Sequence, residues 1–145
     1  MQHPTILMQG ITKIFATDEM ETHALRGIDL QISSGDFVSI CGPSGCGKST
    51  LLSILGMLDS PSAGAYLFDG TDIARYSEKQ LAQLRKTKLG FVFQSFNLID
   101  ELTVFQNVEL PLQYQGLAAG ERKTRVEAIL KRMQIDHRAD HLPLQ

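Results

Sequence analysis

The stretch that decides the fold is Gly42-Pro43-Ser44-Gly45-Cys46-Gly47-Lys48-Ser49-Thr50. It holds a glycine, four further residues and then Gly-Lys-Ser, which is the complete Walker A pattern. Residues 37–41, a short apolar run rich in β-formers, come directly before it, and residues 51–58 after it have the spacing of an apolar helix. A strand, a glycine loop and a helix in this order predict an α/β protein built around a P-loop.

The residues of this loop suit the wrapping of a triphosphate by backbone N–H groups. Glycines at 42, 45 and 47 allow unusual backbone angles and keep side chains out of the path. The free N–H groups and the dipole of the following helix attract an anion. We expect Lys48 to lie between the β- and γ-phosphates, Ser49 to ligate Mg²⁺ and Thr50 to reach the α-phosphate. The predicted ligand is Mg-ATP, and the predicted contacts are Gly42, Pro43, Ser44, Gly45, Cys46, Gly47, Lys48, Ser49 and Thr50.

The composition is that of one globular domain, with 145 residues, of which 43% are hydrophobic and 21% charged. A formal net charge of −2 argues against a protein that grips a nucleic-acid backbone, because such proteins carry a basic excess. The first residues lack the features of a signal peptide, and no apolar run approaches the roughly 20 residues of a membrane span. We therefore expect no direct membrane insertion. Cys41 and Cys46 match no zinc or redox spacing, which favours reduced thiols.

Short apolar runs and turn residues divide the rest of the chain into strands followed by helices. Two capping boxes, Ser77 with Gln80 and Thr103 with Gln106, mark helix starts. Pro111 is expected to end or kink the second of these helices. The pattern predicts strands at residues 6–15, 25–32, 37–41, 65–68 and 89–93, and helices from 48, over 77–86, from 103 and over 118–133.

Three further stretches carry a family resemblance: Thr22-His23-Ala24-Leu25-Arg26-Gly27-Ile28, Gly90-Phe91-Val92-Phe93-Gln94-Ser95-Phe96-Asn97-Leu98, and Asn107-Val108-Glu109-Leu110-Pro111-Leu112. Together with the glycine loop they resemble the nucleotide-binding subunit of ABC transporters over residues 5–145. Within that superfamily the chain looks most like the group that serves lipoprotein release and macrolide export. The resemblance implies a P-loop NTPase (ABC ATPase) core with an N-terminal antiparallel β-subdomain, truncated at the start of the helical region that carries the signature.

The resemblance also implies two contacts outside the loop. Phe15, which follows residues 11–14, corresponds to the aromatic position that stacks on adenine, although the residue alone also fits a core side chain. Gln94 corresponds to the Q-loop glutamine, which approaches Mg²⁺ and the attacking water, although alone it also fits a surface side chain. Residues 95–112 are implied to lie near the groove that receives the transporter's coupling helix. The implied catalytic residue is Gln94, and the implied metal ligands are Ser49 and Gln94.

The family pattern continues with elements that do not occur in residues 1–145. These are the LSGGQ signature, the Walker B aspartate, the catalytic glutamate and the switch histidine. We therefore expect a partial nucleotide-binding domain over residues 1–145 that does not hydrolyse ATP by itself. The family also places further strands between those predicted at 37–41 and 89–93, so both runs are expected to be incompletely covered.

The resemblance implies an ATP-binding subunit that couples ATP binding and hydrolysis to export or lipoprotein release. Its implied partners are transmembrane permease subunits and a second copy of the full-length subunit, with no nucleic acid. Its implied place is the cytoplasm, peripheral on the inner face of the cell membrane through the permease. Three alternatives stay open: another P-loop enzyme such as a GTPase or small-molecule kinase, an ABC-type ATPase acting on DNA, and a non-catalytic module that docks to a transporter.

Overall fold

The computed structural model of the chain describes residues 4–17 and 20–145. Its contacts divide the chain into two compact units, residues 1–85 and 86–145. Each unit has buried side chains of its own: Met8, Ile11 and Ile54 are fully buried in the first, and Val126 in the second.

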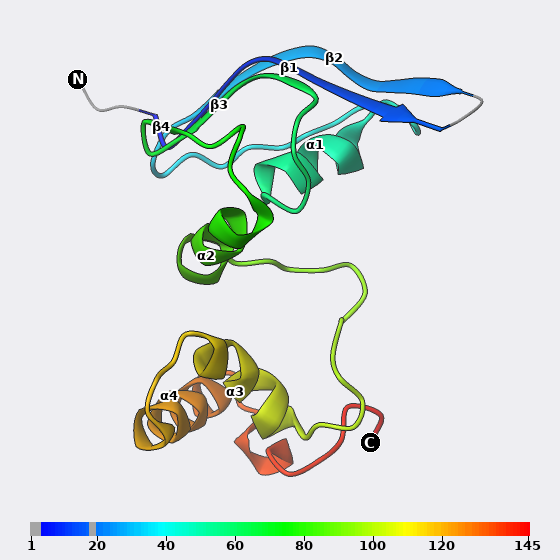
Figure 1. The fold of residues 1–145 in the computed structure, drawn as a ribbon. Coiled ribbons are helices and arrows are strands. Elements are labelled where there is room, and N and C mark those ends of the chain that lie inside the picture. Colours follow the sequence, from blue (N-terminus) through cyan, green and yellow to red (C-terminus); the bar gives the residue numbers. More distant parts are fainter. Residues whose placement is uncertain (1–3, 18–19) are drawn as a thin grey trace. The chain divides into compact units, whose positions relative to one another are not determined.

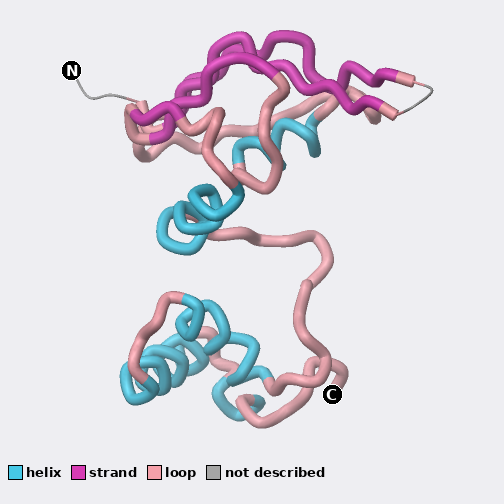
Figure 2. The backbone as a smooth tube through the Cα atoms, in the orientation of Figure 1, coloured by secondary structure: helices cyan, strands magenta, loops and turns pink. Residues whose placement is uncertain are grey.

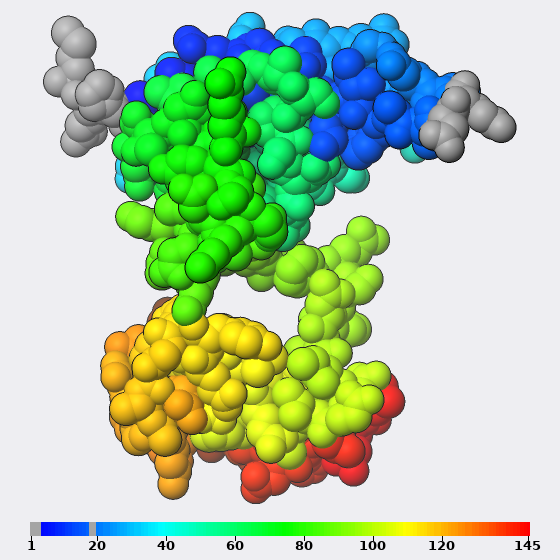
Figure 3. Space-filling model, in the orientation of Figure 1, coloured from blue at the N-terminus to red at the C-terminus, as the bar shows by residue number. Residues whose placement is uncertain are grey.

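The first unit is built on a four-stranded antiparallel sheet with strand order β2-β1-β3-β4 (Figure 1). Its strands are β1 (Ile6–Ala16), β2 (Glu21–Ile32), β3 (Ala63–Phe68) and β4 (Thr71–Asp72). The strands predicted over residues 6–15, 25–32 and 65–68 are confirmed, with β2 beginning four residues earlier than predicted. Because β1 pairs with β2 on one side and β3 on the other, it is a central strand, and Figure 3 shows its blue atoms in contact with the green atoms of the segment that contains β3.

Helix α1 (Lys48–Leu55), which follows the glycine loop, packs against one face of this sheet (Figure 1). Ile54 is fully buried, and Tyr66 is only 2% exposed. The Tyr66 O–H donates to the Leu55 carbonyl at 2.9 Å, and burial raises the pKa of Tyr66 to about 12. Burying each large apolar side chain contributes about 1.5–3 kcal/mol. The helix that begins at the loop is therefore held firmly on the sheet.

Only one face of α1 is buried, although residues 51–58 read as apolar nearly all round. Leu52 and Leu58 are 55% and 53% exposed, and the helix ends at Leu55. An apolar pattern nearly all round predicts a helix buried in a core. That prediction is wrong for Leu52 and Leu58, because the sheet covers only one face of α1.

The second unit is helical. Its helices are α3 (Val104–Tyr114), α4 (Ala119–Arg132) and the short 3₁₀-helix η1 (Asp136–Arg138). Helix α2 (Glu78–Lys88) lies mostly in the first unit, and its last turn begins the second. The helices predicted from sequence are confirmed to within two residues at each predicted end. α3 and α4 pack together, with Val126 and Leu130 of α4 buried. Among the residues that the structure describes, none of the helices combines the length and apolar character needed to cross a bilayer.

Pro111 does not end α3, which continues to Tyr114. A proline in a helix interior removes one backbone hydrogen bond and crowds the carbonyl four residues before it. Two contacts offset this cost: the capping box of Thr103 and Gln106 at the start of the helix, and the Arg122 Nε to Glu109 Oε1 ion pair at 2.8 Å with α4. The expected end of the helix at Pro111 is therefore wrong, because a local cap and one ion pair to α4 support a helix that continues past the proline.

Two predicted strands, residues 37–41 and 89–93, are neither strand nor helix (Figure 2, pink). No strand of the described residues pairs with either run, and an extended segment without a neighbour cannot satisfy its backbone groups in a ladder. Phe37 is 99% and Val92 103% exposed. The strand predictions are therefore wrong, whereas the expectation that both runs are incompletely covered agrees with these exposures.

Candidate functional site

The glycine loop turns sharply at Gly45 and Gly47, which adopt left-handed φ angles of 78° and 94°. The Cys46 N–H donates to the Pro43 carbonyl at 3.4 Å and closes the turn. A Cβ on Gly47 would lie 2.5 Å from the Ala24 carbonyl oxygen of β2. Glycine is therefore required at this position both by backbone angle and by the close approach of the sheet.

Gly42 does not have the unusual backbone angle expected from the sequence, because its φ is not left-handed. A Cβ there would lie 2.7 Å from Cys46 Sγ. The two ends of the loop thus approach each other so closely that a side chain on Gly42 would displace the thiol.

The N-terminus of α1 is open. Gly47 is its N-cap, and within the described residues no side chain accepts a hydrogen bond there and no acidic residue lies in the first turn. The N–H groups at the start of a helix have no partner inside the helix, and they carry the positive end of its dipole. Lys48, Ser49 and Thr50 supply these N–H groups, so the loop ends in a concentration of positive potential.

The Lys48 side chain folds back over the loop. Its Nζ donates to the carbonyls of Gly42 at 2.9 Å and Pro43 at 2.7 Å, and it lies 3.8 Å from Cys46 Sγ. The ammonium is therefore held beside the backbone that carries the free N–H groups. Ser49, the next residue, is exposed, so its hydroxyl is accessible from solvent. The residues predicted to contact the phosphates are brought together by the structure.

A hollow of about 360 Å³ lies beside the loop and strand β2. The side chains and backbone that line it come from His23, Ala24, Leu25, Arg26, Ile28, Gly45 and Cys46. The strand thus forms one wall of the space next to the phosphate loop.

Phe15 lies in β1 opposite Thr22 of β2 and is 46% exposed. A core phenylalanine would be buried, so the alternative reading of Phe15 as a core side chain is wrong. The Lys13 Nζ lies 5.0 Å from the centroid of the Phe15 ring, which is within the range of a cation–π contact. The sequence reasoning missed Lys13. The signal that could have found it is its position two residues before Phe15, on the same face of the strand.

Gln94 lies in the second unit, in the exposed segment between α2 and α3. The structure therefore groups the phosphate loop with Phe15 in one unit and assigns Gln94 no position relative to them. Near Gln94, the rings of Phe91 and Phe93 stack at 5.7 Å between centroids with 7° between their planes.

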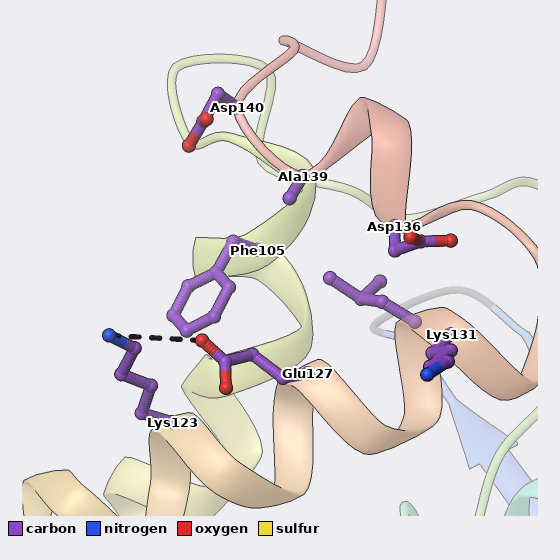
Figure 4. Close-up of a pocket in the computed structure, with 8 residues that line it drawn as sticks. Phe105, Lys123, Glu127, Lys131, Asp136, Ala139 and Asp140 are labelled. Carbon is purple, nitrogen blue, oxygen red and sulfur yellow. Dashed lines mark ion pairs between the residues drawn. The ribbon is translucent and has the colours of Figure 1, made fainter.

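A larger pocket of about 600 Å³ lies in the second unit (Figure 4). Charged side chains surround it, and Lys123 and Glu127 form an ion pair across 3.8 Å. Its lining residues are Phe105, Lys123, Glu127, Leu130, Lys131, Asp136, Ala139 and Asp140. None of the predicted site residues is among them, and no glycine lines the pocket. It is therefore not the candidate phosphate site.

The fold and the loop define a P-loop ATPase cassette. The chain is similar to the solved structure of the ATP-binding cassette MJ0796, a dimeric post-hydrolysis state bound to ADP and Pi, with a TM-score of 0.85 and 40% identity. The likeness covers 97% of this chain and 62% of that one. A protein-family model described as ABC transporter matches residues 25–144. The chain belongs to the ABC transporter family.

Curated relatives confirm the resemblance to the macrolide-export group. The chain is 48% identical over 142 residues to the macrolide export ATP-binding/permease protein MacB of Marinobacter nauticus. It is 46% identical over 146 residues to the pyoverdine export ATP-binding/permease protein PvdT of Pseudomonas fluorescens. These matches cover 98% and 100% of this chain but 22% of each relative. The chain thus spans about a fifth of the length of the exporters that it matches.

Proposed function

We propose that residues 42–50 bind the phosphates of Mg-ATP and that the chain is the nucleotide-binding part of an ABC export ATPase. One observation carries the proposal: an uncapped helix start and the Lys48 ammonium meet at a loop whose Gly47 has no room for a side chain. Such a loop gathers N–H donors and positive charge at one point, which is what a polyphosphate requires.

Each residue has a role in this proposal. The loop N–H groups surround the β-phosphate, Lys48 exchanges its carbonyl partners for phosphate oxygens, and Thr50 contacts the α-phosphate. Phe15 stacks on adenine through the part of its ring that is exposed. Ser49 and Gln94 would hold Mg²⁺, and the ion would supply positive charge to neutralise the phosphates. Gln94 also orients the attacking water.

The export role is supported by the names of the relatives. A macrolide exporter and a pyoverdine exporter are almost equally similar to this chain, so export of a small molecule through a permease fits both, and neither cargo is preferred. We propose permease subunits as partners and a second copy of the nucleotide-binding domain, because the MacB relative combines ATP-binding and permease parts and the MJ0796 cassette is dimeric. The proposed location is the cytoplasmic face of the membrane, reached through the permease.

The binding proposal is tested by calorimetric titration of the chain with Mg-ATP. Lys48→Ala removes a charged donor to the phosphates, and hydrogen bonds of that kind contribute about 1.5–3 kcal/mol. The expected loss of affinity is therefore about ten- to a hundredfold. Lys79→Ala is the matched control, because it removes the same charge from the exposed face of α2. Equal affinities in the two variants would refute the phosphate-loop assignment.

We further propose that residues 1–145 bind ATP without steady turnover. Positioning of the phosphates is only part of catalysis, and the water must also be oriented and activated. In this chain Gln94 is the only residue proposed for that task. A phosphate-release assay on the chain beside its Lys48→Ala variant should give equal rates. Release clearly above that control would overturn the non-catalytic reading and make the chain an ATPase in its own right.

A further inference from the structure

The Lys13 side chain makes three contacts at one end of the sheet. Its Nζ lies 2.6 Å from Asp59 Oδ1, donates to the Ser60 carbonyl at 2.8 Å and stands 5.0 Å from the Phe15 ring centroid. The Lys13 side chain is only 13% exposed. A lysine held by a carboxylate and a carbonyl while shielded from water has one orientation, so its ammonium is a fixed cation against the ring.

These contacts join Phe15 to the helix of the phosphate loop. Asp59 and Ser60 belong to the segment that leaves α1, and that segment is also tied to β1 by Ser62. The Ser62 N–H donates to the Thr12 carbonyl at 2.8 Å, and Ser62 Oγ accepts from the Ile14 N–H at 3.0 Å. Lys13 thus lies where the strand that carries the aromatic ring meets the end of the helix that begins at the loop.

We propose that Lys13 is a positioning residue for the base of the nucleotide: it orients the Phe15 ring and fixes its place relative to the phosphate loop. The proposal rests on the proposed binding of ATP by the loop and by Phe15. Lys13 itself does not contact the nucleotide.

Two physical effects support this role. A cation attracted to a ring face restricts the rotation of that side chain, so less conformational entropy is lost when a base stacks on it. The cation also covers part of the ring, which leaves the remaining exposed surface as the place for adenine. Lys13 therefore contributes to the base-dependent part of the affinity and not to the phosphate-dependent part.

The test compares Mg-ATP with Mg-tripolyphosphate, which presents the phosphates without a base. Calorimetry is performed on the 145-residue chain, on Lys13→Met and on Lys13→Arg, with Lys79→Met as the control for loss of one positive charge. A cation–π contact is worth about 0.5–2 kcal/mol. We expect Lys13→Met to lose about two- to thirtyfold in ATP affinity, with tripolyphosphate affinity unchanged. Lys13→Arg should restore most of the ATP affinity, because it keeps a cation beside the ring.

Two further variants separate positioning from a general effect on folding. In a Phe15→Ala background, Lys13→Met should change ATP affinity by less than twofold, because the ring that it orients is gone. Should Lys13→Met fail to fold, Asp59→Asn keeps the lysine and removes only its carboxylate anchor, and the same loss confined to ATP is expected. Equal losses for ATP and tripolyphosphate, or an undiminished Lys13 effect without Phe15, would overturn the inference. Failure of the proposed function looks different: Lys48→Ala would then leave both ligands unaffected.

Discussion

The N-termini of α1 and α3 show two solutions to the same problem. Both helices follow an irregular segment, and both begin with N–H groups that have no partner within the helix. At α3 the chain satisfies these groups itself: Thr103 Oγ1 accepts from the Gln106 N–H at 3.2 Å, and Gln106 Oε1 accepts from the Thr103 N–H at 2.8 Å. At α1 the N-cap is Gly47, which offers no side-chain acceptor.

The segment before α3 is also closed by its own side chains. The Asn107 carboxamide accepts from the Ile99 N–H at 2.9 Å and donates to the carbonyls of Ile99, Leu102 and Thr103. At α1, by contrast, the Lys48 side chain donates to carbonyls of the loop that precedes the helix. It therefore leaves the N–H groups of the helix start free. A helix start filled by its own side chains stabilises the fold, whereas one left open and positive is available for an anion.

The largest effect is expected from adding a side chain at Gly47, the N-cap of α1. In Gly47→Ala the new Cβ meets the Ala24 carbonyl, and an alanine in a left-handed conformation costs about 1–3 kcal/mol before that clash is counted. We expect a loss of Mg-ATP affinity of more than about a hundredfold in calorimetric titration. Gly120→Ala is the control, because that glycine lies in α4 with open space around it. Retained affinity in Gly47→Ala would mean that the observed loop conformation is not the one that binds phosphate.

The next largest effect concerns the proposed stacking of adenine on Phe15, which would add affinity beyond that of the open helix start. Phe15→Ala should lose roughly 1–3 kcal/mol of Mg-ATP binding, by analogy with measured base–aromatic stacking. Phe15→Tyr should be nearly neutral, because it keeps the aromatic face. Titration of both variants with Mg-ATP decides the matter, and equal losses would assign Phe15 to packing.

The filled helix start should behave in the opposite way. Thr103→Ala removes the N-cap acceptor of α3 and should cost about 1 kcal/mol of unfolding free energy, measured by urea titration. Its Mg-ATP affinity should stay unchanged, since α3 contributes no residue to the phosphate loop. An affinity loss as large as that of Gly47→Ala would remove the distinction between the two helix starts.

The smallest effect concerns the contact that holds α3 to α4, and it depends on pH. The hydrogen bond from Arg122, followed by that from Gln113, holds the pKa of Glu109 below its ordinary value of 4.5. Because the pKa is lowered in the folded state, this contact stabilises the fold above pH 4.5 and is lost as the pH falls through the lowered value. Glu109→Gln should therefore lower the unfolding temperature near pH 7, and its effect should decrease as the pH falls below 4.5.

Calorimetric scans of unfolding at a series of pH values from 7 to below 4.5 check the Glu109 prediction. Glu121→Gln is the control, because Glu121 pairs with Arg125 on the exposed surface of α4 and such pairs contribute little. A Glu109→Gln effect that stays constant with pH would show that the carboxylate charge is not what stabilises the contact.

Much of the candidate site was predictable because its chemistry is local. Gly42, Gly47 and Lys48 lie within seven consecutive residues, and the contacts of Lys48 reach no further than Gly42. The capping box of Thr103 and Gln106 is equally local and was predicted correctly. Patterns of this kind are set by residue types at short spacing, so they can be read without knowing the fold.

The sequence by itself thus determined the position of the glycine loop before α1, the helix starts and three strands of the antiparallel sheet. Only the tertiary structure decided whether apolar runs became strands: β3 has β1 and β4 as neighbours, whereas residues 37–41 and 89–93 pair with no strand of the described chain. Only it brought Lys13 to Asp59, which is 46 residues further along the chain. The physical reason is the same in both cases: strand pairing and long-range ion pairs depend on partners that chain folding alone brings within reach.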